Sequence, residues 1–443
     1  MDSLKEEKNL EESLYERALK VLPGGISRNV IFRQPHPHYV ASAHGCYVED
    51  VNGITRIDFV NNIASLVHGH AHPAIVKAVY EQLQKGTAYS MGTEAEIRHA
   101  ETLCHRVPGF EKIRFMNSGT EAVMSLIKAS RAYTGKHKIA KAEGAYHGSY
   151  DFAEVSESAS PDNWGPVEQP NSVPHVRNTP PSVLDEVIVF PYNDVERTLA
   201  ILDRHADEIA CVLIDPVPHR IGMIRATDEF VEAVYDWTRK HNTLMAFDEV
   251  VCFRINYEGA QALYRVKPDL TALGKLIGGG FPVGALTGKA EIMDVLNPLQ
   301  TPLRFSLSGT FSANPITMTA GRVAVEMFDK QAVDKVNHLA QEAKEQLMQA
   351  AKIAGIPLSV AGAGSMMKMH FRETLPSNYR ECYEDANHKK TVNTFLDFMY
   401  DHGIILVYSN SCFFSTVMKQ EHIDKLSETA LEGFKFIKPL LNV

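Results

Sequence analysis

One lysine in the sequence lies between an apolar run and three consecutive glycines. Lys275 follows the segment 269–274 and is followed by Gly278-Gly279-Gly280. A lysine in a partly apolar site has a lowered pKa and can act as an amine nucleophile. The alternative is a solvated lysine in a flexible glycine-rich loop. A nucleotide-binding P-loop is excluded here, because the segment contains no GxxxxGK[ST] pattern.

A second candidate is an acidic pair at the end of an apolar strand. The run 243–247 stops at Asp248-Glu249, which is 27 residues before Lys275. In a parallel sheet this position puts a carboxylate at the carboxyl edge, where ligands bind. A buried anion there favours the protonated form of a basic partner, such as a heteroaromatic nitrogen. The alternative is an aspartate that only caps the next turn.

A third candidate joins an expected strand to an expected helix. Ser118-Gly119-Thr120 follows the apolar segment 113–116 and precedes a helical pattern over 120–133. Free N–H groups at a helix N-terminus, with two hydroxyls beside them, suit a phosphate group. An ordinary Ser/Thr helix cap is the alternative.

These candidates occur in a fixed order with two further segments. Tyr146-His147-Gly148 comes between Ser118-Gly119-Thr120 and Asp248, and Ser308-Gly309-Thr310 comes after Lys275. An anion cradle, a ring-stacking aromatic, a strand-end acid and a nucleophilic lysine are together what pyridoxal 5'-phosphate requires. The combination is more specific than any single motif.

The same segments resemble the class III pyridoxal-phosphate-dependent aminotransferases, in the branch of glutamate-1-semialdehyde aminomutase and β-phenylalanine aminotransferase. The resemblance covers about residues 15–330. It implies a fold-type-I α/β architecture, with a mostly parallel, seven-stranded sheet and a small α+β domain built from both termini. The matching stretches are PGGISR (23–28), HGHAHP (68–73), 117–139, EGAYHG (143–148), DEV (248–250), 268–286 and SGTFSANPITMTAG (308–321).

The resemblance also implies roles for individual residues. Lys275 would hold the cofactor as a Schiff base and then transfer protons, and Asp248 would keep the pyridine nitrogen protonated. Arg28 would pair with a substrate carboxylate, and Thr310 would reach the phosphate from the neighbouring subunit of a homodimer. The cofactor-binding set implied in this way is Ser118, Gly119, Thr120 (phosphate), Tyr146 and Val250 (the two ring faces), Asp248, Lys275 and Thr310.

Two departures from the aminomutase pattern fall on the expected substrate side. Asp215-Pro-Val-Pro-His219-Arg220 stands where the aminomutase has Glu-Pro-Val followed by Gly-Asn, and Cys252 follows Val251 directly in a loop one residue shorter. They favour an aminotransferase that acts on a 2-oxo acid and on an amino acid or amine, with β-amino acids among the candidate donors. The alternatives are the aminomutase, a racemase or epimerase, a catalytically silent relative and a nucleotide-binding protein.

The elements that must position these residues alternate between strand and helix. Short apolar runs and helical patterns alternate from about residue 73 to 247, which predicts a mainly parallel sheet with helices on both faces. The expected domains are 1–70 and 326–443, which form the small domain, and 71–325, which binds the cofactor. Segment 155–182 interrupts the alternation and reads as a long functional loop.

Composition limits the partners. With 45 Lys and Arg against 54 Asp and Glu, the net charge is −9 and there is no basic stripe, so nucleic acid is not expected. No apolar run is long enough for a membrane span, and the acidic N-terminus has no signal-peptide core. Six scattered cysteines without CxxC spacing indicate a reducing compartment, so a cytoplasmic location and no metal site are expected.

Other residue groups have weaker claims to a role. Arg33, Arg220, Arg254 and Arg304 could meet a carboxylate, but surface or structural roles are expected. The histidines of 36–44 and of HGHAHP are expected to be turn and strand residues.

Overall fold

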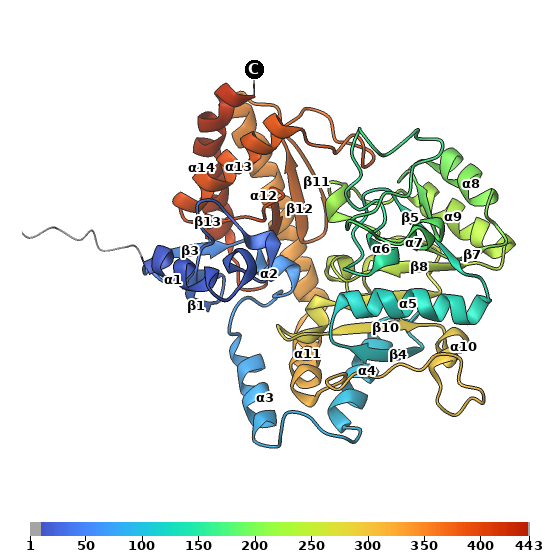
Figure 1. Cartoon of the computed structure of the whole chain (residues 1–443). Helices are drawn as coiled ribbons and strands as arrows, with labels where there is room; N and C mark the ends of the chain where they lie inside the picture. Colours follow the sequence, from blue (N-terminus) through green and yellow to red (C-terminus); the bar gives the residue numbers. More distant parts are fainter. Residues whose placement is uncertain (1–9, 442–443) are drawn as a thin grey trace, which may run out of the picture.

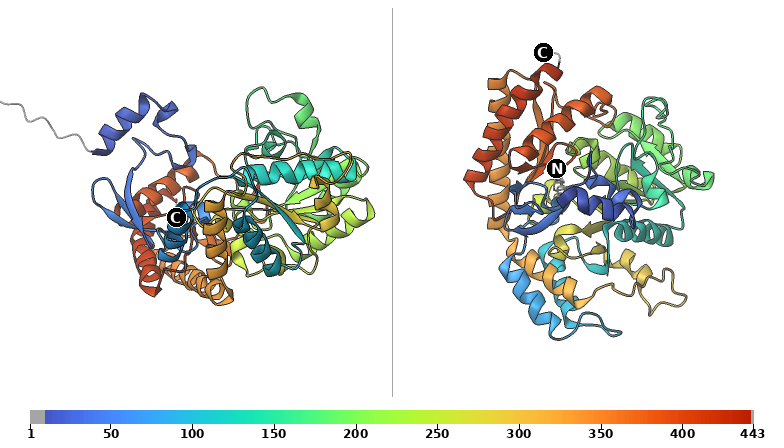
Figure 2. Two further views of the ribbon diagram at one scale, coloured as in Figure 1. Left: turned by 90° about the horizontal axis from the view of Figure 1, so that it is seen from below. Right: turned by 60° about the vertical axis from the view of Figure 1, so that its left-hand side comes forward.

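The computed structural model of the chain describes residues 10–441, so part of the acidic N-terminal segment considered above lies outside the described residues. A large lobe and a small lobe lie side by side (Figure 1), and Figure 2 shows the same arrangement from two further directions. No helix within 10–441 combines the length and the apolar character that crossing a bilayer requires.

The large lobe contains the predicted seven-stranded sheet. Its order is β4-β10-β9-β8-β7-β5-β6, and four neighbouring pairs are parallel, while β10 is antiparallel to β4 and to β9. The expected α/β fold with a mostly parallel sheet is therefore confirmed. The strands are β4 (Lys112–Met116), β5 (Lys138–Ala142), β6 (Val187–Phe190), β7 (Ile209–Ile214), β8 (Leu244–Asp248), β9 (Leu270–Gly274) and β10 (Gly284–Gly288).

Helices bury both faces of this sheet. On β7, Cys211 and Leu213 pack with the helix α5, whereas Val212 and Ile214 pack with α9. Successive side chains of a strand point to opposite faces, so the uninterrupted apolar runs of β7 and β8 reflect burial on both sides. The helices of this lobe are α3 (Pro73–Leu83), α4 (Glu94–Arg106), α5 (Gly119–Thr134), α6 (Asp151–Glu154), α7 (Pro181–Asp185), α8 (Val195–Asp203), α9 (Asp228–Lys240), α10 (Ala290–Met293) and α11 (Pro315–Met327).

The small lobe combines segments from both ends of the chain. In a four-stranded sheet of order β1-β2-β3-β13, the C-terminal strand β13 pairs in parallel with β3. A second sheet has the order β11-β12-β14. The elements are α1 (Leu10–Leu19), β1 (Val40–His44), β2 (Tyr47–Asp50), β3 (Thr55–Asp58), α2 (Asn61–Ala64), α12 (Lys330–Ala354), β11 (Ser359–Ala363), β12 (Met366–His370), α13 (Ala386–Asp401), β13 (Ile404–Ile405), β14 (Ser411–Phe413) and α14 (Gln420–Ile437).

The largest apolar core joins the two lobes. It includes Leu273 and Ile277 beside the lysine, together with the buried faces of α12 and α14. The domain limits at residues 70 and 325 stay predictions, although the second falls near the end of α11 at Met327.

Candidate active site

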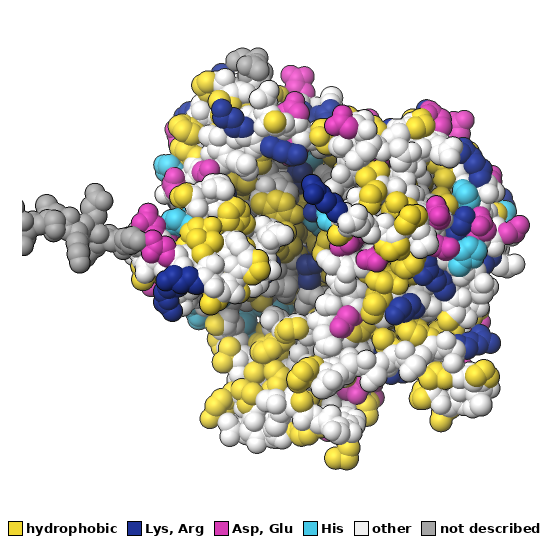
Figure 3. Space-filling model, viewed as in Figure 1, with side chains coloured by type: hydrophobic (Ala, Val, Ile, Leu, Met, Phe, Trp, Pro, Cys, Tyr) yellow, Lys and Arg dark blue, Asp and Glu magenta, His cyan; other side chains and the backbone are white. Residues whose placement is uncertain are grey.

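A cavity of about 340 Å³ lies where β8, β9 and the N-terminal end of α5 meet residues of the small lobe. Figure 3 shows the surface hollowed between the two lobes. Six of the residues expected from the sequence line this cavity. These and their main neighbours are Asn62, Gly119, Thr120, Tyr146, His147, Asp215, His219, Asp248, Val250 and Lys275.

Lys275 stands directly after the last residue of β9 and begins a short 3-10 helix, Lys275–Gly278. Its φ of +49° is unusual for a residue other than glycine and marks a position that the surrounding structure must hold in place. Burial lowers the pKa of the Lys275 amine, while the carboxylates of Asp248 and Asp215 raise it. Desolvation therefore favours the neutral, reactive form of the amine, and the two acids act against this effect.

Asp248 ends β8 and is held by a buried histidine. The Nδ1 atom of His147 lies 2.8 Å from Asp248 Oδ2, and the N–H of Val250 donates to Asp248 Oδ1 at 3.0 Å. Burial lowers the pKa of His147, and the hydrogen bond to Asp248 opposes that shift. A neutral imidazole that donates from Nδ1 therefore orients the carboxylate. The remaining atom, His147 Nε2, is buried without a hydrogen-bond partner in the described part of the chain.

The N-terminal end of α5 opens into the same cavity. Ser118 caps the helix, because its Oγ accepts the N–H of Glu121 at 3.1 Å. Gly119 is needed for close packing, since a Cβ atom there would lie 2.8 Å from Val250 Cγ1. Free N–H groups at a helix terminus and the positive end of its dipole together suit an anion.

The structure adds two residues to the site that the sequence did not assign to it. Asp215 follows β7, and its Oδ1 accepts the N–H of Val217 at 2.9 Å. Burial, and then the nearby charge of Asp248, raise the pKa of Asp215 well above its usual range. His219 lines the cavity edge-to-face with Tyr146, and burial lowers its pKa to about 3. The departure from the aminomutase pattern at 215–220 was the only sequence signal for them.

Arg28 lies at the mouth of the cavity rather than in its lining. This exposed side chain donates from Nη1 to Asn62 Oδ1 at 2.9 Å, and Asn62 lines the cavity. The charge of Arg28 also reaches the lysine, because it contributes to the lowered pKa of Lys275. Thr310 is exposed and does not line the cavity of its own chain.

The other four arginines differ in their surroundings. Arg254 is buried and donates to Ser365 Oγ and to two backbone carbonyls, so its role is structural. Arg33 pairs with Asp397 at 3.4 Å. Arg220 pairs with Glu157 at 3.0 Å, and Arg304 is exposed.

The site and the fold together define an enzyme of the fold-type-I class that uses pyridoxal phosphate. The cavity offers an anion cradle at α5, an aromatic ring at Tyr146, an oriented carboxylate at Asp248 and a partly desolvated amine at Lys275. The buried Nε2 atom of His147, which has no partner within residues 10–441, also fits a site that receives a polar group.

Comparison with known proteins identifies the family. The class-III aminotransferase family profile matches residues 32–430, so the chain belongs to this family. This result confirms the resemblance found in the sequence and, with it, pyridoxal 5'-phosphate as the cofactor and an enzymatic function.

Individual relatives bear two different names. A glutamate-1-semialdehyde 2,1-aminomutase of Methanothermobacter thermautotrophicus is 36% identical over 438 residues, which cover 96% of this chain and 99% of that protein. An omega-transaminase from Sphaerobacter thermophilus has a structure with a TM-score of 0.95 and 40% identity, covering 98% of this chain and 99% of that one. A transaminase with pyridoxal phosphate bound has a TM-score of 0.89, 35% identity and 98% coverage of both chains.

Proposed function

We propose that the protein transfers an amino group between an amino acid or amine and a 2-oxo acid, in two successive half-reactions. The observation that carries this proposal is the Lys275 amine in a cavity that Asp248 and Asp215 also line. A small-molecule donor fits a cavity of about 340 Å³ better than a macromolecule does.

Different cavity residues would bind different parts of the cofactor. Pyridoxal phosphate, when bound, supplies an aldehyde for the amino group and a ring that accepts electrons. Ser118, Gly119 and Thr120 would hold its phosphate at the N-terminus of α5, as the positive end of a helix dipole favours. Tyr146 and Val250 would cover its two ring faces.

Two titratable groups would control protons in the reaction. Asp248, oriented by His147, would keep the ring nitrogen protonated, because a fixed carboxylate stabilises a positive charge beside it. Lys275 would carry a proton between carbon atoms of the reacting system. Its lowered pKa increases the fraction of neutral amine near pH 7, and only the neutral amine can accept a proton.

The aminotransferase is favoured over the aminomutase by the substrate side of the cavity. His219 occupies a segment that differs from the aminomutase pattern, and its ring faces Tyr146. The likeness to an omega-transaminase, with a TM-score of 0.95, supports the same assignment. The aminomutase stays the second candidate, because relatives bearing that name are 36% identical over 96% of this chain.

Separated half-reactions distinguish these candidates. The purified yellow holoenzyme is mixed with an amino donor but no 2-oxo acid, and its absorbance is followed at about 410–430 nm, where the protein-bound cofactor absorbs. An aminotransferase stops after one equivalent of donor and recovers its band on addition of pyruvate or 2-oxoglutarate. An aminomutase converts glutamate-1-semialdehyde repeatedly without a 2-oxo acid, and a racemase inverts the donor without bleaching. Either of these results would reject the proposal.

Arg28 provides a prediction about substrate choice. The variant Arg28→Ala should raise KM for donors that carry a carboxylate by about 10- to 100-fold, because a charge-assisted hydrogen bond contributes about 1.5–3 kcal/mol. For an amine without a carboxylate, KM should change less than about twofold. Steady-state kinetics with both kinds of donor measure the difference.

Arg33→Ala is the matched control for this experiment. Arg33 belongs to the same N-terminal segment but pairs with Asp397 instead of approaching Lys275. A selective loss for carboxylated donors in Arg33→Ala, and not in Arg28→Ala, would move the carboxylate contact to Arg33.

A homodimer is part of the proposed function, since Thr310 would reach the cofactor phosphate of the partner subunit. A large apolar side chain is exposed directly beside Thr310 in the chain, because Phe311 is 61% exposed. Dilution to the monomer should therefore weaken cofactor binding, and Thr310→Val should weaken it without dissociating the dimer. Sedimentation and cofactor titration test this, and undiminished binding by a demonstrated monomer would contradict it.

A further inference from the structure

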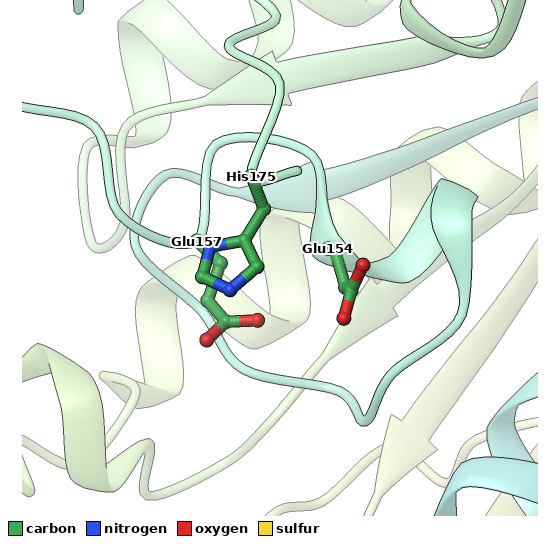
Figure 4. Close-up of side chains that lie close together, drawn as sticks. All are labelled: Glu154, Glu157 and His175. Carbon is green, nitrogen blue, oxygen red and sulfur yellow. The ribbon is translucent and has the colours of Figure 1, made fainter. Parts of the chain in front are cut away.

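Three side chains of types that can bind a metal meet outside the active-site cavity, in and just before the long loop 155–182, for which the sequence indicated no particular function. Glu154 ends α6, Glu157 follows it by three residues, and His175 lies on the returning limb of the loop. Each offers one ligand atom, and these atoms all lie within 4.8 Å of one another. Figure 4 shows the imidazole of His175 over the carboxylate of Glu157, with the Glu154 carboxylate beside it.

Backbone hydrogen bonds hold the two limbs of the loop together at this cluster. The N–H of Ser156 donates to the carbonyl of Val173 at 2.8 Å, and the N–H of Val173 donates to Ser156 Oγ at 2.9 Å. Ser156 Oγ also donates to the carbonyl of Asn171 at 2.7 Å. Ser156, which lies between the two glutamates, is thus hydrogen-bonded to the segment just before His175. The three donors are therefore brought together by the fold rather than by freely moving side chains.

An unpartnered carboxylate oxygen of Glu157 is independent evidence for a ligand at this cluster. Its side chain is only 2% exposed, and its Oε1 pairs with Arg220 Nη1 at 3.0 Å. Its other oxygen, Oε2, is buried and has no hydrogen-bond partner anywhere in residues 10–441. An unsatisfied buried carboxylate oxygen is costly, and a coordinated cation would remove that cost.

Two neighbouring cations, Lys141 and Arg220, offset the charge of the glutamates but leave carboxylate oxygens of the cluster without a direct partner. The buried Lys141 donates its Nζ protons to the carbonyls of Ala145 and Val155, at 2.9 and 2.6 Å, and not to either glutamate. Arg220 uses one oxygen of Glu157. Glu154 forms no ion pair with any residue in the described part of the chain.

We propose that Glu154, Glu157 and His175 bind a divalent transition-metal cation, Zn²⁺ being the best match, which fastens the two limbs of the loop. One imidazole nitrogen and two carboxylate oxygens are ligands that Zn²⁺ accepts at about 2.0–2.2 Å, with a water in the remaining position. Ligand atoms around such an ion lie about 3–4 Å apart. In this structure the ligand atoms lie within 4.8 Å of one another, which is slightly farther apart. Because His175 is exposed, a small rotation of its side chain brings its ring nitrogen to the shorter distance. The expectation from the sequence, that the chain has no metal site, did not include this cluster.

The test is a titration of the tag-free holoenzyme, dialysed against chelator, with zinc chloride in a calorimeter. The wild-type protein should bind one Zn²⁺ at this site. His175→Ala and Glu154→Gln should each weaken that binding about tenfold or more, as the loss of a ligand requires. His338→Ala is the matched control, because His338 is also exposed, lies on α12 and pairs with a single glutamate in the ion pairs of residues 10–441, Glu342. It should leave the binding unchanged.

A second readout shows that the metal lies on the loop. Zn²⁺ should slow proteolysis between residues 158 and 170 in the wild-type protein and in His338→Ala, but not in His175→Ala. Both variants replace exposed histidines, so far-ultraviolet circular dichroism should show all three proteins equally folded. Equal zinc affinity in His175→Ala and wild type, or no binding by the wild type, would overturn the proposal.

Discussion

Replacing Lys275 by alanine should lower turnover by about 10⁴-fold or more and abolish the covalent attachment of the cofactor. The amine is both the nucleophile and the proton carrier in the proposed reaction, and a positioned acid–base group alone contributes about 10²–10⁴-fold. The cavity lining otherwise stays intact, so the variant should still bind the cofactor without a covalent bond. Borohydride reduction followed by peptide mass spectrometry should find the adduct on Lys275 of the wild type and no adduct in the variant.

Lys128→Ala is the matched control for this prediction. Lys128 is an exposed residue of α5, the helix whose N-terminus faces the cavity. Its replacement should leave the adduct and the turnover unchanged. Retained turnover in Lys275→Ala would refute the assigned role, and an adduct on another lysine would move the site.

Replacing Asp248 by asparagine should lower kcat by about 10²–10³-fold, which is the size expected when one preorganised charge interaction is removed. The amide has nearly the shape of the carboxylate and can still accept the Nδ1 proton of His147. It cannot stabilise a protonated ring nitrogen, because it carries no charge. The visible band of the bound cofactor should shift in Asp248→Asn, and cofactor binding should weaken less than kcat falls.

The matched control is Asp294→Asn, at a half-buried position beyond β10 where the side chain contacts Lys112, Asn297 and Gln300 and lies outside the cavity lining. It should change neither kcat nor the spectrum. A normal kcat with an unchanged spectrum in Asp248→Asn would show that this carboxylate does not act on the cofactor ring.

The central sheet could be predicted from sequence because its strands are buried on both faces. The run of β7 is apolar throughout, that of β8 is apolar up to Asp248, and the helix α9 between them has an amphipathic pattern. The antiparallel strand β10, which lies between β4 and β9, was not recognised as a strand, because its sequence, Gly284–Gly288, begins and ends with glycine. The glycine at the start of β10 is required by a steric contact that hydrophobic periodicity does not reveal. A Cβ atom on Gly284 would lie 1.9 Å from the carbonyl oxygen of Ser118.

The site was predictable in its parts but not in its connections. Lys275, Asp248 and Gly119 were identifiable from local sequence, since each follows a strand. The hydrogen bond between His147 and Asp248 spans 101 residues, and only the fold brings the two together. Lys141 is buried in β5 and donates to two carbonyls. The sequence of β5 alternates like that of a half-exposed strand, so it predicts neither the burial of this lysine nor its partners.

The pairing of β3 with β13 has a consequence for biosynthesis. Ile57 pairs with Ile404, so the N-terminal sheet acquires its fourth strand only from the other end of the chain. A ribosome releases residue 404 after the entire central sheet has been made. The large lobe can therefore collapse first, while the edge of β3 stays open in the nascent chain. Exposed strand edges attract other chains, so this stage is where the growing polypeptide depends most on a chaperone.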